Sequence, residues 1–237
     1  MKKITLSVII SVLSFSAVFA QTVDEIVAHH LNAFGGAAKL REVKTLILEN
    51  TIKVQGLEFE NRTTLLVNRA MRSDSKIMGN ELVQAFDGTT PWEITPILMG
   101  GNGQPQVMAE ETAKSVITQI DPFPLLDYAE KGTKLAIIAT EKVKGKEAHH
   151  LKMWPKNGNE SEIWINAADG FMSKLKTVQN GQEVEVTFSE YVQIEGLNFA
   201  MRMETSNPMA GTITIDTKTV KLNPAIDALI FKMPTHK

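Results

Sequence analysis

The spacing of hydrophobic positions along the chain changes near Lys44. Before that residue, apolar side chains recur every three or four positions, which predicts an amphipathic helix over 23–34 that ends at Gly35-Gly36. Thr22 and Glu25 form the pattern of a capping box at the start of this helix. Its expected inner face carries Val23, Ile26, Val27, Leu31 and Phe34.

After Lys44, apolar and polar residues alternate, as expected for strands with one buried and one solvated face. Turn-forming pairs such as Asp87-Gly88 and Asp169-Gly170 separate these stretches at regular intervals. An antiparallel meander of this length curls on itself. We therefore predict an α+β fold that is mainly antiparallel β: a strongly curved, unclosed β-barrel of roughly eleven strands, with helices covering its concave face.

Two further helical stretches interrupt the alternation. One is predicted over 108–120, where Glu110 and Glu111 lie near the helix start and suit its dipole. A short second one is predicted over 125–128, after Pro124. The glycine-rich stretch 99–105 predicts a mobile surface loop.

Residues 1–20 have the features of a secretory signal peptide. A basic start at Lys2-Lys3 precedes an apolar run that serines dilute, and Ala20 supplies a small residue before the cut. The alternative, a retained anchor helix, is disfavoured by these serines. We expect cleavage after Ala20, localisation in a bacterial periplasm, and a single domain over residues 21–237.

Composition narrows the choice of function. Without Lys2 and Lys3 the chain has 23 basic and 27 acidic residues, a net charge of −4, which argues against nucleic acid as a partner. The absence of cysteine excludes thiol and zinc–thiolate chemistry. The adjacent pairs His29-His30 and His149-His150 point in different directions on a helix and on a strand. We therefore expect no metal, no cofactor and no enzymatic activity.

Short motifs in a fixed order resemble the periplasmic carriers of outer-membrane lipoproteins and the wider lipoprotein-sorting family. They are the segment 68–72 (NRAMR), the segment 82–92 (LVQAFDGTTPW) with Pro96 beyond it, the segment 122–126 (PFPLL), and the segment 231–234 (FKMP). Ala70 stands where the family has proline. The resemblance implies an unclosed β-barrel whose helical lid covers an apolar cavity for acyl chains.

On this resemblance we expect a carrier or binding protein for an acylated ligand, either a lipoprotein or a lipid, that acts as a monomer. The predicted ligand-binding residues are Leu48, Leu65, Met71, Arg72, Phe86, Trp92, Phe123 and Leu126. Because arginine is mostly exposed, its residue type favours a solvated strand position for Arg72, and aromatic burial favours core packing for Trp92. The alternative function is an envelope sensor or scaffold that uses the same fold to bind a protein partner, such as an envelope membrane protein.

Overall fold

All strands of this protein belong to one antiparallel sheet. The computed structural model describes residues 21–156, 159–179, 181–207 and 211–234; the expected signal peptide, residues 1–20, lies outside them. The strands are β1 (Thr45–Val54), β2 (Leu57–Leu66), β3 (Ala70–Ile77), β4 (Asn80–Phe86), β5 (Pro91–Ile94), β6 (Pro105–Val107), β7 (Lys134–Val143), β8 (Lys146–Trp154), β9 (Ser161–Asn166), β10 (Met172–Gln179), β11 (Gln182–Ile194), β12 (Leu197–Asn207) and β13 (Gly211–Leu222).

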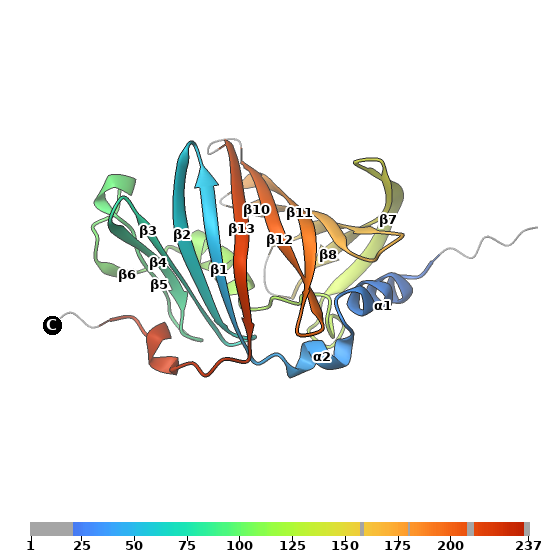
Figure 1. The fold of residues 1–237 in the computed structure, drawn as a ribbon, viewed down its shortest axis with the longest axis horizontal. Coiled ribbons are helices and arrows are strands. Elements are labelled where there is room, and N and C mark those ends of the chain that lie inside the picture. The colour runs from blue at the N-terminus through green and yellow to red at the C-terminus, as the bar shows by residue number, and fades with distance from the viewer. Residues whose placement is uncertain (1–20, 157–158, 180, 208–210, 235–237) are drawn as a thin grey trace, which may run out of the picture.

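The sheet curls without closing. Its strand order is β6-β5-β4-β3-β2-β1-β13-β12-β11-β10-β9-β8-β7, so β6 and β7 form its two edges (Figure 1). Pairing of β1 with β13 joins the first meander to the second; Leu46 lies opposite Leu222 and Val54 opposite Ile213. The predicted antiparallel, unclosed sheet is thus confirmed.

The described sheet has 13 strands, slightly more than the roughly eleven predicted. The two strands that the alternation missed are β5, with 4 residues, and β6, with 3. Neither is long enough to show a period of two. Both follow Asp87-Gly88, and β6 begins at Pro105 inside the stretch predicted as a loop.

The helices are α1 (Val23–Ala33), α2 (Ala37–Glu42) and α3 (Glu110–Thr118), with 3₁₀ turns η1 (Ile97–Met99) and η2 (Ala228–Phe231). The capping box of α1 is present: Thr22 Oγ1 accepts from the Glu25 amide, and Glu25 accepts from the Thr22 amide. The helix predicted over 125–128 is wrong. Consecutive turns occupy this stretch, and Asp127, with φ of 52°, interrupts any helix there.

Both longer helices pack on the same face of the sheet, which we call the inner face. Ile26 and Val27 of α1 pack with Leu151 and other side chains of β8–β10. Val116 of α3 packs with Leu46 and neighbours from β2, β3 and β13. Figure 1 shows the strands fanned across the front, with α3 behind them.

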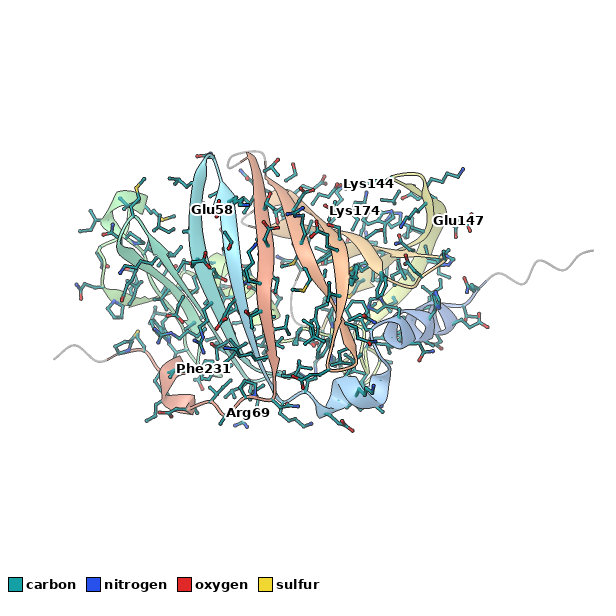
Figure 2. All side chains as sticks on the ribbon, viewed as in Figure 1. Glu58, Arg69, Lys144, Glu147, Lys174 and Phe231 are labelled. Carbon is teal, nitrogen blue, oxygen red and sulfur yellow. The ribbon has the colours of Figure 1, made fainter. Side chains whose placement is uncertain are left out.

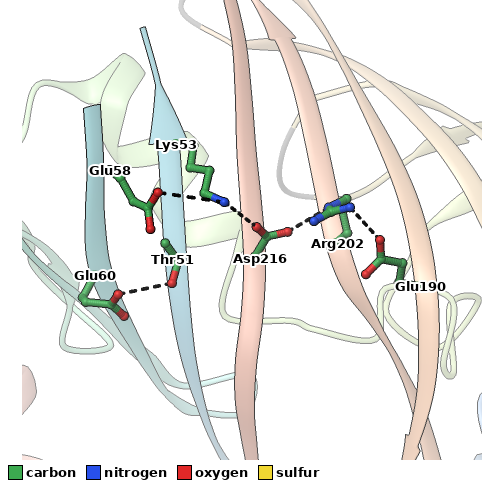
Figure 3. Close-up of polar contacts among 7 residues, drawn as sticks. All are labelled: Thr51, Lys53, Glu58, Glu60, Glu190, Arg202 and Asp216. Atoms are coloured by element: carbon green, nitrogen blue, oxygen red, sulfur yellow. Dashed lines mark hydrogen bonds and ion pairs between the residues drawn. The ribbon is translucent and has the colours of Figure 1, made fainter. Parts of the chain in front are cut away.

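The opposite, outer face carries charge. An ion-pair chain crosses five strands from Glu58 through Lys53, Asp216 and Arg202 to Glu190 (Figure 3). The hydrogen bond from Arg202 holds the pKa of Asp216 below its usual range. Lys174 on β10 also lies on this face, over the Trp164 ring (Figure 2). These ion pairs make the outer face polar over β1, β2 and β11–β13.

Two contacts fix the position of α1 against the sheet: one with the backbone at Gly170 and one with Asn198. A Cβ at Gly170, whose φ is +73°, would lie 2.9 Å from the carbonyl oxygen of His29. Asn198 donates from Nδ2 to the Ala33 carbonyl at 2.7 Å, which ties the end of α1 to the start of β12. Within the described ranges, every helix is too short or too polar to span a bilayer.

Candidate functional site

An apolar cavity of about 250 Å³ lies on the inner face. Its walls come from α1 and α2, from the segment 122–126, and from the inward side chains of β1 and β10–β13. The apolar lining consists of Leu31, Phe34, Leu40, Leu46, Leu48, Pro122, Phe123, Pro124, Leu125, Leu126, Met172, Leu175, Phe188, Phe199, Ala200, Met203 and Val220.

The wall opposite the sheet is the segment 121–131, which we call the strap. It consists of turns, in which the Leu126 amide donates to the Phe123 carbonyl and the Lys131 amide to the Asp127 carbonyl, both at 3.0 Å, and side chains add further bonds. Asp121 accepts from the Phe123 amide at 3.1 Å, and Lys131 Nζ donates to Asp121 at 2.6 Å and to the Phe123 carbonyl at 3.0 Å. Arg41 of α2 binds Asp127 through Nε and Nη2. The strap thus holds Phe123, Leu125 and Leu126 against the cavity.

Among the described residues, three polar side chains line the cavity, and each has a hydrogen-bond partner within the protein. Tyr191 donates to the Met172 carbonyl at 2.7 Å, and Thr217 donates to Asn50 Oδ1 at 2.9 Å. Burial raises the pKa of Tyr191, so its hydroxyl stays protonated. His30 Nδ1 lies 2.9 Å from the Gly170 carbonyl. A carbonyl can only accept, so the neutral ring carries its proton on Nδ1. The cavity therefore offers a largely apolar surface, and each of its three polar side chains already bonds to the protein.

His30 gives the cavity wall a pH dependence. Burial lowers its pKa from 6.5 to about 4, more than the hydrogen bond to Gly170 raises it. In the unfolded chain the imidazole takes up a proton near its ordinary pKa, whereas in the folded chain it stays neutral until about pH 4. The unfolded state therefore binds more protons between these values, and stability rises with pH across this window.

We expect the free energy of unfolding to fall by about 2 kcal/mol between pH 7 and pH 5 through His30. The His30→Gln variant can still donate to Gly170 but does not titrate, so its stability should change less over this range. His149, whose pKa burial also lowers, contributes in the same direction to both proteins. Urea unfolding at the two pH values measures the difference. Equal losses in wild type and variant would contradict the role assigned to His30.

The structure places three of the eight predicted ligand-binding residues in the cavity wall: Leu48, Phe123 and Leu126. Leu65, Met71 and Phe86 lie in the adjoining cluster beneath α3, with Met108 and Val116 packed over it. These three line the inner face of the sheet but not the cavity.

Arg72 and Trp92 lie together at the β3–β5 end of the sheet. Trp92 is fully buried and donates from Nε1 to the Phe231 carbonyl at 2.8 Å; Figure 2 labels Phe231. The Arg72 guanidinium lies 5.6 Å from the Trp92 ring centroid, donates to the Ile230 carbonyl and pairs with Asp74. These contacts attach η2 to the sheet.

Sequence reasoning missed most of the cavity wall. Met172, Leu175, Phe188, Phe199 and Met203 come from β10–β12, and none of them is among the predicted ligand-binding residues. The alternation of apolar and polar residues in these strands assigns side chains to one face of the sheet. It does not place them beside Leu48 unless the pairing of β13 with β1 is known. His30 was set aside because its neighbour His29 points elsewhere.

No metal centre emerges from the chain as described at residues 21–156, 159–179, 181–207 and 211–234: it holds no group of three or more His, Asp or Glu side chains in a metal-binding arrangement. The cavity wall has no nucleophile beside a base, since its His30 and Thr217 bond to other partners.

Comparison with solved structures identifies this architecture. The chain is similar to a domain described as an outer membrane lipoprotein-sorting protein from Vibrio parahaemolyticus, with a TM-score of 0.59, 15% identity, and coverage of 87% of this chain and 94% of that one. A LolA superfamily protein from Nitrosomonas europaea gives a TM-score of 0.59 at 11% identity, covering 90% and 98%. The chain has the fold of the lipoprotein-sorting proteins.

A DUF1329 family protein from Desulfovibrio piger shares the lipoprotein-sorting fold as well, with a TM-score of 0.55, 11% identity, and coverage of 90% of this chain and 98% of that one. No family model and no curated protein matches the sequence. The resemblance expected from the short motifs is confirmed at the level of fold. Which molecule fills the cavity is a separate question, because one fold serves many functions.

Proposed function

We propose that this protein is exported to the periplasm and binds the acyl chain of a lipoprotein or lipid, without catalysing a reaction. The observation that carries the proposal is the cavity under the strap: seventeen apolar residues line it, and each of its three polar side chains has a hydrogen-bond partner within the protein. Such a surface gains free energy from apolar contact and offers no group to activate a substrate. The signal-like residues 1–20 support export.

The test is displacement of a fluorescent fatty acid by unlabelled fatty acids of increasing length. Each methylene that enters the cavity should contribute about 0.8 kcal/mol, close to a fourfold gain in affinity, until the cavity is full. The chain length beyond which affinity stops rising then shows how many methylenes the cavity holds. Failure of the wild-type protein to bind the probe, or affinity independent of chain length, would contradict the proposal.

A second candidate function is binding to an envelope membrane protein. It is favoured by η1, where Ile97, Leu98 and Met99 are exposed by 75%, 54% and 51%. Contiguous exposed apolar side chains mark contact sites. If this is the main function, Leu98→Glu should abolish co-elution with the partner in detergent extracts while acyl binding persists. If co-elution survives this change, η1 is not the contact.

A further inference from the structure

A second cavity, of about 290 Å³, adjoins the apolar one. Leu40, Phe123 and Leu126 line both cavities, so these three side chains form the partition between them. The second cavity has a different character on its far side. Arg41, Lys44 and Lys131 line it together with Asp121 and Asp127.

The charges in this second cavity do not cancel. Lys131 pairs with Asp121 at 2.6 Å, and Arg41 pairs with Asp127 at 2.5 Å. Lys44 has no carboxylate partner in the described part of the chain; its Nζ donates to the Arg41 carbonyl at 2.7 Å. An ammonium has three N–H donors, so two remain for a ligand. Glu130 lies near Arg41 but not in the cavity wall.

The two cavities together match the two ends of an amphiphile. An acyl chain suits the apolar side of the partition, and an anionic group suits the side where Lys44 is unpaired. The strap contributes to both, because Leu125 lines the chain cavity while Asp121 and Lys131 line the charged one.

We infer that the charged cavity binds the anionic head group, a carboxylate or phosphate, of the amphiphile whose chain occupies the apolar cavity, with Lys44 as the principal contact. This inference rests on the proposed function, since it needs the chain in its cavity. It adds a ligand class: anionic amphiphiles are preferred over uncharged ones of equal chain length.

The experiment compares ligands that share a dodecyl chain and differ in head group: dodecanol, dodecanoate and dodecyl phosphate. Each displaces an uncharged polarity-sensitive dye from the wild type, Lys44→Gln and Lys114→Gln. Lys114 is the matched control, because it lies on α3, outside both cavities, and pairs with Glu110 at the surface. Charge-assisted hydrogen bonds from Lys44 should make both anions bind about tenfold more tightly than dodecanol at low salt. Added salt should reduce the difference in affinity between the anions and dodecanol, because it screens the charge of Lys44.

Lys44→Gln should remove most of this preference and leave the affinity for dodecanol unchanged, whereas Lys114→Gln should change neither. Equal affinities of the wild type for all three ligands would overturn the head-group inference and leave the proposed function intact. If no ligand displaces the dye, the proposed function itself fails. Inorganic phosphate is the last arm: phosphate that binds as tightly as dodecyl phosphate would show an independent anion site and overturn the inference.

Discussion

The Phe123→Glu variant is expected to bind a long-chain fatty acid at least about tenfold more weakly than the wild type. Phe123 is 7% exposed and lies in the partition between the two cavities. A carboxylate at this position either projects into the apolar cavity, where an incoming chain must desolvate it, or turns toward Lys131 and occupies the head-group position. Both placements oppose binding. Fluorescent fatty acid titration measures the loss.

Leu98→Glu is the matched control, because it introduces the same charge at an exposed apolar residue far from the cavity wall. It should bind the fatty acid as the wild type does, and both variants should keep the β-sheet circular dichroism spectrum. If Phe123→Glu binds equally well, the strap does not form the wall of the ligand site. If both variants lose binding together, the loss is not specific to the cavity.

The Trp92→Ala variant is expected to lower the free energy of unfolding by about 3–5 kcal/mol. Trp92 is 0% exposed, fills the space beside Val83 and Ala85, and holds the Phe231 carbonyl. Trp92→Phe keeps much of the apolar contact but leaves that carbonyl without its donor, at a cost of about 1–3 kcal/mol. Urea unfolding with the wild type as reference measures both.

Measuring the affinity for a fatty acid distinguishes a structural role of Trp92 from a role in ligand binding. Because the ring lies outside the cavity wall, Trp92→Phe should bind the fatty acid with unchanged affinity. A variant that keeps its stability but loses binding would instead restore the ligand role that the motif suggests for Trp92, and with it the role of Arg72.

The local elements of this fold could be predicted from the sequence because local chemistry encodes them. The capping box at Thr22 and the glycines at 35–36 bound α1, and alternation together with turn pairs defines most strands. Elements too short to repeat a pattern, such as β5 and β6, give no such signal. In the strap, Pro124 favours a helix start, but the left-handed Asp127 ends it within one turn.

The cavity could be predicted only in part, because it depends on contacts distant in sequence. Val220 of β13 lies opposite Leu48 of β1. That pairing brings β10–β12 next to the first meander and creates the wall that contains Met172 and Met203. The sequence motif instead drew attention to Met71 and Phe86, which share the inner face but pack beneath α3. Alternation assigns a residue to a face of the sheet; it does not say which part of that face stays open.

Methionine methyl groups offer the most direct test of the central claim, that an acyl chain occupies this cavity. With ¹³C-methyl methionine in the protein and a protonated fatty acid bound, nuclear Overhauser contacts identify the methyl groups near the chain. The account predicts contacts from acyl protons to Met172 and Met203, which line the cavity, and none to Met78 or Met99, which are 72% and 51% exposed. Contacts confined to Met78 and Met99, or to Met71 and Met108 beneath α3, would contradict it.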